Sequence, residues 1–395
     1  MNILVIVNTP VDENGDVLCA TGYGKIANDL NAGLRRRGVH VKTVGLEQLA
    51  LERFPDKYGP EDDLPWEYKY VDDEDLADIL IKLGEGFESV LVHDSCLLPM
   101  KFAEHVGSRC TRIVHDPSFA DPLYGMVEGR LRRDYDWSKE CLLEPRHQLR
   151  VRKYLSTIIG TTVSPDFSLA RLHAAASRQW DLAGKVVFPS TELKHAMHFA
   201  RISVNTKCTV IPHFDTFAKA PQKSKGVGIL INAAWGKMDI PLIMTFLQRV
   251  RHVPIFVLTG TKTYDTYFKV FSDYYGFSDN INFVDSMEPE SFHEFCMQNI
   301  GLCFHPSIIM ETFGLLPYEM AAMGIPTILG HDAFSGLRTA IRRLNLEAFS
   351  ISQFDSSALA EVSKIIEKHS TRISTYEPRI VLGDVDSYIE ALYNV

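Results

Sequence analysis

The sequence predicts an α/β fold of two domains, each built on a parallel β-sheet. Short apolar segments alternate with segments of helical periodicity along the whole chain, a pattern typical of parallel sheets covered by helices on both faces. The chain has 395 residues, 46% of them hydrophobic, which is sufficient for two hydrophobic cores. The polar and basic residues 215–225 separate two series of strands, as a linker between domains does.

In the first series, apolar segments predict strands at residues 2–8, 39–45, 88–94, 110–115, 157–162 and 185–189. A helix is expected over residues 24–37, because Ile26, Leu30 and Leu34 recur at helical spacing. It ends in a run of arginines followed by glycine, a combination that favours a helix C-terminus. Two regions interrupt the alternation: residues 46–70, expected as a long loop, and residues 117–155, a long insertion of the kind that is usually functional.

In the second series, strands are expected at residues 226–232, 253–259, 281–285, 300–305 and 325–329. A last helix is expected over residues 384–395. We therefore predict two Rossmann-like domains, residues 1–214 and residues 215–395.

Composition and charge exclude several classes of protein. No apolar segment approaches the 18 or so residues that cross a membrane, and residues 2–7 lack the basic start of a signal peptide. The seven cysteines are odd in number and form no Cys-x-x-Cys pair, which favours a reduced, cytoplasmic protein without structural zinc. A net charge of −9 argues against a protein that coats DNA, although local basic clusters remain possible.

Two carboxylates, Glu311 and Glu319, flank Gly314 at the start of an apolar helical segment. Eight positions along a helix turn through about 800° and rise about 12 Å, roughly the distance from a sugar ring to the ribose of a nucleotide sugar. Glycine permits close approach of a ligand to the backbone, and the free N–H groups of a helix start attract phosphate. An ordinary helix with two solvated glutamates is the alternative. Apolar strands on both sides of the segment instead favour a ligand site at the carboxyl edge of a sheet.

The segment 311–319 resembles the Glu-x7-Glu motif of retaining nucleotide-sugar glycosyltransferases with the GT-B fold. This group includes glycogen synthases, sucrose synthases and bacterial mannosyl- and glucosyltransferases. Further segments follow in the order of that family: Gly22 and Gly24 after the first strand, His115-Asp116, residues 187–190 and residues 210–215. The resemblance implies two Rossmann-like domains whose parallel sheets face a central cleft, with the last helix returning to the first domain. It also implies an enzyme that uses a nucleotide-diphosphate sugar as co-substrate and needs neither a metal nor another cofactor.

The resemblance assigns the donor site to the second domain. Glu311 would bind sugar hydroxyls and Glu319 the ribose hydroxyls, since a carboxylate accepts two hydrogen bonds from a vicinal diol. The backbone N–H groups of Phe313, Gly314 and Leu315 would hold the distal phosphate. We expect these glutamates to bind substrate rather than to act as general bases.

Positive charge on the leaving diphosphate would come from lysines. Lys237 stands where the family places a phosphate-binding lysine, but the upstream arginine of the family is replaced here by residues 233–235, Ala-Ala-Trp. Lys262 is a candidate second cation, and Lys237 as an ordinary surface lysine is the alternative. In the family, the loop of Gly22 and Gly24 faces the donor phosphate. The nucleotide base lies near the position of Met287.

His115 follows a predicted strand, and in the family a histidine here contacts the donor sugar near the reacting carbon. A buried histidine with a structural role is the alternative. His93 and Asp94 repeat the pattern after the preceding strand, so the second pair could hold the same role or bind the acceptor. Asp116 or Asp94 could accept the proton of the acceptor hydroxyl.

Residues 129–154 carry eight Lys or Arg and four Asp or Glu, a net charge of +4 in an acidic chain, together with aromatic residues. The family binds acceptors on its first domain, so Arg132, Arg133 and Arg150 are candidate contacts for an anionic acceptor: a saccharide phosphate, a lipid head group or a nucleic acid. A solvated helical face with internal salt bridges is the alternative.

The sequence thus predicts a cytoplasmic, retaining glycosyltransferase that moves a hexosyl or pentosyl group from a nucleotide sugar, UDP-linked, to a hydroxyl acceptor. A phage-type DNA glycosyltransferase acting on hydroxymethylated pyrimidines is one alternative. A sugar-nucleotide epimerase or a non-catalytic nucleotide-sugar sensor is another.

Overall fold

The computed structural model describes most of the two sheets and their helices. The described residues are 1–18, 22–58, 69–94, 97–115, 119, 126–127, 130–131, 144–146, 149, 168–204, 207–214, 226–233, 238–248, 250, 253–259, 262–274, 276, 280–285, 287, 289–307, 314–329, 348–350, 364 and 383–393. The predicted linker, residues 215–225, and the predicted strand at 157–162 lie outside them.

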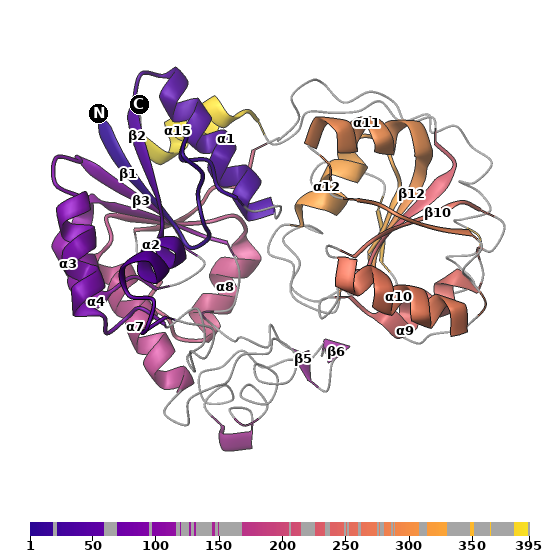
Figure 1. Ribbon diagram of the computed structural model, residues 1–395, viewed down its shortest axis with the longest axis horizontal. Coiled ribbons are helices and arrows are strands. Elements are labelled where there is room, and N and C mark those ends of the chain that lie inside the picture. Colours follow the sequence, from indigo (N-terminus) through magenta and orange to yellow (C-terminus); the bar gives the residue numbers. More distant parts are fainter. Residues whose placement is uncertain are drawn as a thin grey trace. The chain divides into compact units, whose positions relative to one another are not determined.

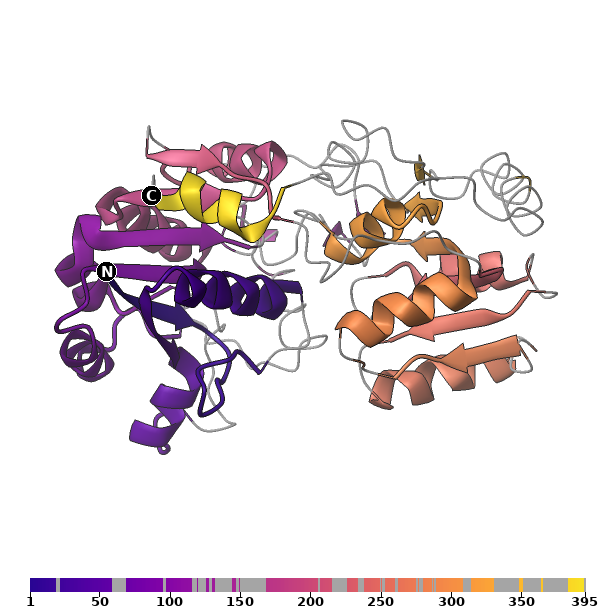
Figure 2. The ribbon, with the colours of Figure 1, turned by 90° about the horizontal axis from the view of Figure 1, so that it is seen from above.

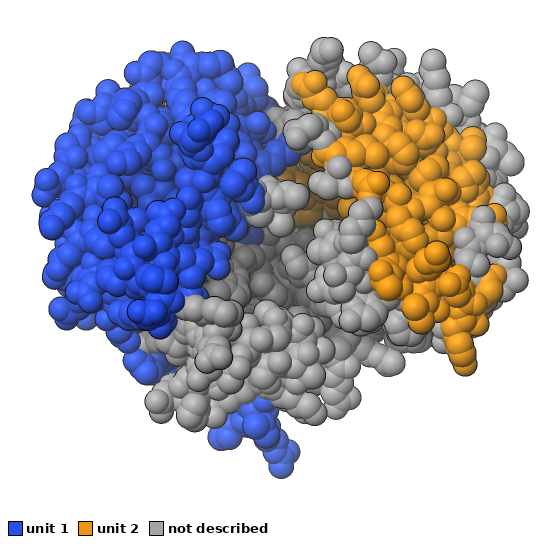
Figure 3. Space-filling view, viewed as in Figure 1, with its two compact units in different colours: residues 1–124, 135–216, 382–395 blue, residues 125–134, 217–381 orange. Residues whose placement is uncertain are grey.

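The chain divides into two compact units (Figure 3). The first unit comprises Met1–Tyr124, Tyr135–Thr216 and Leu382–Val395, and the second comprises Gly125–Asp134 and Phe217–Val381. Each unit contains one six-stranded sheet (Figures 1 and 2).

The sheet of the first unit has the strand order β2-β1-β3-β4-β7-β8. All of its paired strands are parallel. The strands are β1 (Asn2–Val7), β2 (His40–Gly45), β3 (Ser89–Asp94), β4 (Cys110–Val114), β7 (Lys185–Phe188) and β8 (Cys208–Val210). The side chains of β1 from Ile3 to Val7 are buried, as expected for a central strand covered on both faces. All of the strands predicted from the described part of this unit are confirmed, and β8 is an additional short strand at the edge of the sheet.

The helices of the first unit follow its strands along the chain, and α15 is the last element of the chain. They are α1 (Gly22–Arg36), α2 (Leu46–Arg53), α3 (Glu74–Leu83), α4 (Met100–Val106), the 3-10 turn η1 (Gly107–Arg109), α7 (Leu169–Leu182), α8 (Thr191–Phe199) and α15 (Val385–Tyr393). Figure 1 shows α3, α4 and α7 as one group, and contacts join α3 to α4 and α4 to α7. The prediction of a loop from residue 46 was wrong for α2, which buries Leu46 and Ala50 at helical spacing.

The C-terminal helix α15 packs against α1 within the first unit. The contact is close because Gly33 has no side chain: a Cβ there would lie 2.8 Å from Cδ1 of Ile389. At the surface, Arg37 pairs with Asp386 and Glu390, each at 3.1 Å. A lysine at the start of β7, Lys185, donates hydrogen bonds to two carbonyls in the last turn of α15, where four carbonyls lack helical partners.

The sheet of the second unit has the order β11-β10-β9-β12-β13-β14 and is also parallel. Its strands are β9 (Gly228–Asn232), β10 (Ile255–Leu258), β11 (Ile281–Phe283), β12 (Ile300–His305), β13 (Thr327–Leu329) and β14 (Ala348–Ser350). Its helices are α9 (Ile240–Leu247), α10 (Lys262–Tyr274), α11 (Pro289–Asn299) and α12 (Leu315–Ala322), and a two-stranded hairpin joins β5 (Met126–Val127) to β6 (Arg130–Leu131). The predicted strands are confirmed, and β14 is an addition at the sheet edge.

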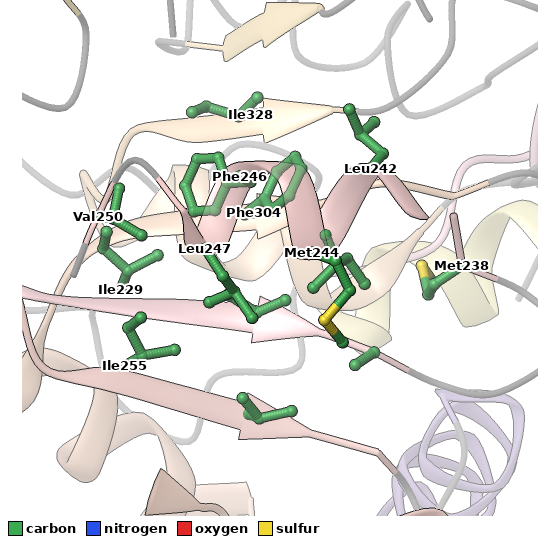
Figure 4. Close-up of a cluster of buried hydrophobic side chains, with 14 of the residues drawn as sticks. Ile229, Met238, Leu242, Met244, Phe246, Leu247, Val250, Ile255, Phe304 and Ile328 are labelled. Atoms are coloured by element: carbon green, nitrogen blue, oxygen red, sulfur yellow. The ribbon is translucent and has the colours of Figure 1, made fainter. Parts of the chain in front are cut away.

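The core of the second unit lies between α9 and its sheet (Figure 4). Phe246 of α9 stacks on Phe304 of β12 with ring centroids 4.2 Å apart, beside buried Leu242 and Ile328. Such stacked aromatic pairs add about 1 kcal/mol to the burial of their area. This packing fixes α9 on one face of the central strands. Among the described residues, no helix is both long enough and apolar enough to cross a membrane.

Candidate functional site

The helix α12 follows β12 in the second unit, so it begins at the carboxyl edge of the sheet, where open α/β folds bind ligands. Gly314 precedes it in the left-handed conformation, with φ 71° and ψ 70°. Glycine adopts this conformation without the cost of roughly 1–2 kcal/mol that a Cβ brings. As the N-cap residue, Gly314 offers no side-chain hydrogen bond to the first N–H groups of the helix. Its first N–H groups therefore suit an anion.

Glu319 lies one turn into α12 and is only 7% exposed. Nε2 of His293, on α11, is 3.3 Å from Oε2 of Glu319, and His293 is itself 8% exposed. A buried carboxylate is costly unless it is hydrogen-bonded. The His293 contact supplies one such bond and fixes the rotamer of Glu319.

A second polar pair lies at the ends of neighbouring strands of the same sheet. Nδ2 of Asn232, the last residue of β9, is 3.1 Å from Nδ1 of His305, the last residue of β12. Asp239 accepts a hydrogen bond from the N–H of Leu242 and so caps α9, with its own N–H bonded to the carbonyl of Pro306. These contacts hold the segments that leave β9 and β12.

In the first unit, His93 and His115 come from the carboxyl ends of the paired strands β3 and β4. Their rings are stacked at 10° with centroids 5.2 Å apart, and Nδ1 of His93 is 3.0 Å from Nε2 of His115. His93 is 1% exposed and His115 is 8% exposed. Nε2 of His93 is buried and has no hydrogen-bond partner among the described residues.

Two further rings complete this cluster, which we call the histidine cluster (His93, His115, His213 and Tyr23). His213, which follows β8, stacks on His115 with centroids 5.6 Å apart. Tyr23, in the first turn of α1, meets the His115 ring edge-on at 5.1 Å. The Tyr23 hydroxyl accepts a hydrogen bond from the N–H of Asn8 at the end of β1. The rings thus tie α1 to the carboxyl ends of three strands.

Burial keeps the three imidazoles neutral. It lowers the pKa of His93 to about 3, with a smaller contribution from charge on His213, and the pKa of His213 to about 4. The pKa of His115 lies well below its usual value for the same reason, and both neighbouring histidines add to the effect. A desolvated imidazolium is unfavourable, and three such groups in contact disfavour charge on one another. At neutral pH these histidines are hydrogen-bonding groups rather than cations.

The structure describes part of the predicted site. His93, His115, Gly314 and Glu319 occupy the places described above, and Leu315 opens α12. The expected loop of Gly22 and Gly24 was wrong: both glycines lie in the first turn of α1, which begins at Gly22. Met287 is 40% exposed between β11 and α11. The backbones of Asp94 and Lys262 end β3 and begin α10, but their side chains are outside the description. The remaining candidates lie outside the described residues: Asp116, Lys237, Glu311, Phe313, Arg132, Arg133 and Arg150.

Sequence reasoning did not select His213, His293, Asn232, His305 or Tyr23. His213 and Tyr23 lie inside segments that the resemblance singled out for other residues. For Asn232, His305 and His213, the available signal was a polar residue at or just after the end of a strand. His293 gave no signal, because its position on α11 becomes meaningful only when α11 packs beside α12. Among the described residues, no group of three or more His, Cys, Asp or Glu side chains is arranged to hold a metal ion.

Comparison by sequence gives no relatives: no protein-family model matches the chain, and no curated protein matches it significantly. Comparison by structure finds proteins of similar fold. Sucrose-phosphate synthase from Thermosynechococcus elongatus aligns with a TM-score of 0.58 at 15% identity, over 99% of this chain and 94% of that one. HepE from Anabaena, in complex with UDP and glucose, gives 0.56 at 14% identity over 99% and 95% of the two chains.

The catalytic domain of starch synthase IV from Arabidopsis thaliana, bound to ADP and acarbose, gives a TM-score of 0.56 at 10% identity, over 100% of this chain and 98% of that one. At these identities the likeness establishes the fold. The two parallel sheets, in this order along the chain, are those of the GT-B fold.

Proposed function

We propose that this protein is a glycosyltransferase that moves a sugar from a nucleotide-diphosphate sugar to a hydroxyl acceptor. The observation that carries the proposal is the arrangement around α12. A helix start without a side-chain cap follows a left-handed glycine, and a buried carboxylate held by His293 lies one turn further. These features match the two chemically distinct parts of such a donor, its diphosphate and the diol of its ribose.

Each part of the donor has a proposed partner in the second unit. Glu319 accepts hydrogen bonds from the ribose hydroxyls, and the N–H groups of Leu315 and its neighbours bind the distal phosphate. Glu311 binds hydroxyls of the sugar, while Lys237 and Lys262 balance the charge of the diphosphate. Preorganised donors and cations of this kind lower the barrier, because negative charge grows on the leaving group. Backbone groups near Met287 contact the base.

In the proposed reaction, the acceptor oxygen forms a bond to the anomeric carbon as the bond from that carbon to the phosphate oxygen breaks. The leaving diphosphate keeps the bonding electron pair and takes up the proton of the acceptor hydroxyl. The configuration at the anomeric carbon is retained. No protein group forms a covalent bond in this scheme, so the residues of the site bind, orient and stabilise charge.

We further propose that the donor is UDP-linked and that residues 129–154 of the insertion contact an anionic acceptor. HepE is described in complexes with UDP and with UDP-glucose, and starch synthase IV with ADP, which supports a nucleoside diphosphate as the recognised group. The positive charge of the insertion supports the acceptor assignment.

The proposal is tested by calorimetric titration with UDP-, GDP- and ADP-glucose, followed by donor-hydrolysis assays. Glu319→Gln keeps the shape of the side chain but removes its charge, so it should weaken nucleotide binding by about 10–100-fold, equivalent to about 1.5–3 kcal/mol for a hydrogen bond to a charged group. Glu294→Gln, an exposed position on α11, is the matched control and should bind like the parent. Absence of binding by the parent to every nucleotide sugar would refute the proposal, and equal affinities of the two variants would remove Glu319 from the site.

Retention of the anomeric configuration is tested separately: proton NMR of the first-formed product, with label in the donor sugar only, shows the configuration of the new glycosidic bond. An inverted anomeric configuration would contradict the retaining assignment and leave the donor assignment intact.

A further inference from the structure

His93 and His115 form a buried pair that has one hydrogen bond between two neutral rings. A neutral imidazole carries one N–H and one bare nitrogen, so only one of the two facing nitrogens carries the shared hydrogen. The contact at 3.0 Å between Nδ1 of His93 and Nε2 of His115 therefore has two possible directions. The second nitrogen of His93 decides between them.

Nε2 of His93 is buried and has no hydrogen-bond partner among the described residues. If His115 were the donor, His93 would have to carry its hydrogen on Nε2, which would leave a buried N–H without an acceptor. An unsatisfied buried donor costs about 1–3 kcal/mol, and orphaned N–H groups are rarer in proteins than under-satisfied acceptors. The favoured arrangement puts the hydrogen of His93 on Nδ1, where it is donated to His115.

The tautomer of His115 follows from that of His93. Its Nε2 accepts the hydrogen bond, so its own hydrogen must reside on Nδ1. Both rings are held in place, because His213 stacks on one side of His115 and Tyr23 meets its edge. The same burial that lowers the pKa of His115 prevents it from carrying a second proton at neutral pH.

We propose that His93 is a positioning residue which fixes His115 in the Nδ1–H tautomer, so that His115 acts on its substrate as a hydrogen-bond donor and not as a base. Its consequence for the reaction rests on the proposed function and on the resemblance, which implies that a histidine at the position of His115 contacts the donor sugar. It gives His93 a role behind His115, in place of direct contact with the acceptor. It also leaves the proton of the acceptor hydroxyl to the leaving phosphate.

The tautomers can be measured without any substrate. Two-bond 1H–15N correlation spectra of the full chain labelled at histidine distinguish a nitrogen that carries hydrogen from a bare one. Assignment uses the single variants His93→Asn and His213→Gln. We expect both His93 and His115 to carry hydrogen on Nδ1 at pH 7.5. A spectrum with hydrogen on Nε2 of either residue would overturn the inference.

Two substitutions separate the two nitrogens of His93 in function. The amide nitrogen of asparagine occupies the place of Nδ1, whereas that of glutamine reaches the place of Nε2. His93→Asn should retain most of the rate of UDP-glucose hydrolysis. His93→Gln and His93→Leu should lower kcat by about tenfold, the equivalent of one lost hydrogen bond, with little change in the calorimetric Kd for UDP.

His173→Leu is the matched control for loss of a buried histidine. His173 lies on α7 of the same unit and is 1% exposed, as His93 is. This variant should lose stability without losing kcat. Unchanged kcat in His93→Leu, or equal losses in His93→Asn and His93→Leu, would overturn the positioning role. Failure of the parent to bind any nucleotide sugar would instead refute the proposed function, and the spectra would still test the tautomers.

Discussion

Acid should destabilise the first unit through its three buried histidines. In the unfolded chain a histidine has a pKa near 6.5, whereas burial lowers the pKa of His93 to about 3 and that of His213 to about 4. As pH falls below 6.5, the unfolded chain takes up protons that the folded unit refuses, so the equilibrium moves toward unfolding. The stability is complete above pH 6.5 and is lost progressively as pH falls toward the folded pKa values.

The size of the effect follows from proton linkage. A group whose pKa falls from 6.5 to about 4 on folding lowers the unfolding free energy by about 2 kcal/mol when the pH is lowered from 7 to 5. His93 contributes a similar amount, which gives about 4 kcal/mol for the two. His115 acts in the same direction, because its pKa also lies well below the usual value. Such a loss is a large part of the 5–15 kcal/mol that stabilises a typical folded domain.

Urea denaturation followed by circular dichroism at pH 7 and pH 5, at constant ionic strength, measures this loss. In His213→Gln the loss between the two pH values should be smaller by about 2 kcal/mol, whatever its stability at pH 7. His195→Gln, at an exposed position on α8, is the matched control for replacing a histidine by glutamine. All other titrating groups cancel in the comparison.

The reasoning fails if His213→Gln and the parent lose equal stability between pH 7 and pH 5. Equal losses would mean that His213 takes up its proton in the folded protein as readily as in the unfolded chain. Water or a counter-charge would then have to reach the histidine cluster.

Three further predictions concern a buried amide in the first unit and the surroundings of α12 in the second. Gln179→Leu should lower the unfolding free energy by about 3 kcal/mol in urea denaturation, because it removes the buried acceptor of Arg112 and both bonds to the loop after β3. Gly314→Ala should cost about 1 kcal/mol of stability and weaken UDP binding in calorimetry, since its φ is 71°. His293→Gln keeps a donor near Glu319 and should bind UDP nearly as the parent does, whereas His293→Leu should bind about tenfold more weakly.

The strands could be predicted because each is a short run of apolar residues between polar ones. Such runs are determined locally, by the need to bury both faces of a parallel sheet. The strands that escaped prediction are too short to show a pattern: β8 and β14 are three-residue edge strands, and β5 and β6 have two residues each. The helix α2 was predicted as part of a loop, because the acidic and aromatic residues 62–70 that follow it are untypical of a buried helix or strand. Leu46 and Ala50 nevertheless lie at helical spacing and are buried.

The site could be predicted only where a strand or helix end marks it. Glu319 and Gly314 were identifiable from one local motif, and the repeated His-Asp pattern placed His93 and His115 on neighbouring strands. The partner of Glu319 was not identifiable, because His293 lies 26 positions earlier and meets it only through the packing of α11 and α12. Distance in the sequence hides such pairs, since helical and strand periods predict only local neighbours.

Burial of the histidine cluster has one effect on stability and one on protonation, and both arise from desolvation of the rings. It makes the unit sensitive to acid, because a charged imidazole is excluded from the cluster. It also removes the ambiguity of protonation that an exposed histidine has near its pKa of 6.5, so each ring keeps one N–H across the neutral range. The proposed Nδ1–H tautomer of His115 is therefore constant over this range. A group with a constant protonation state suits substrate orientation, whereas a general base needs a pKa near the working pH. The low pKa of His115 therefore argues for orientation.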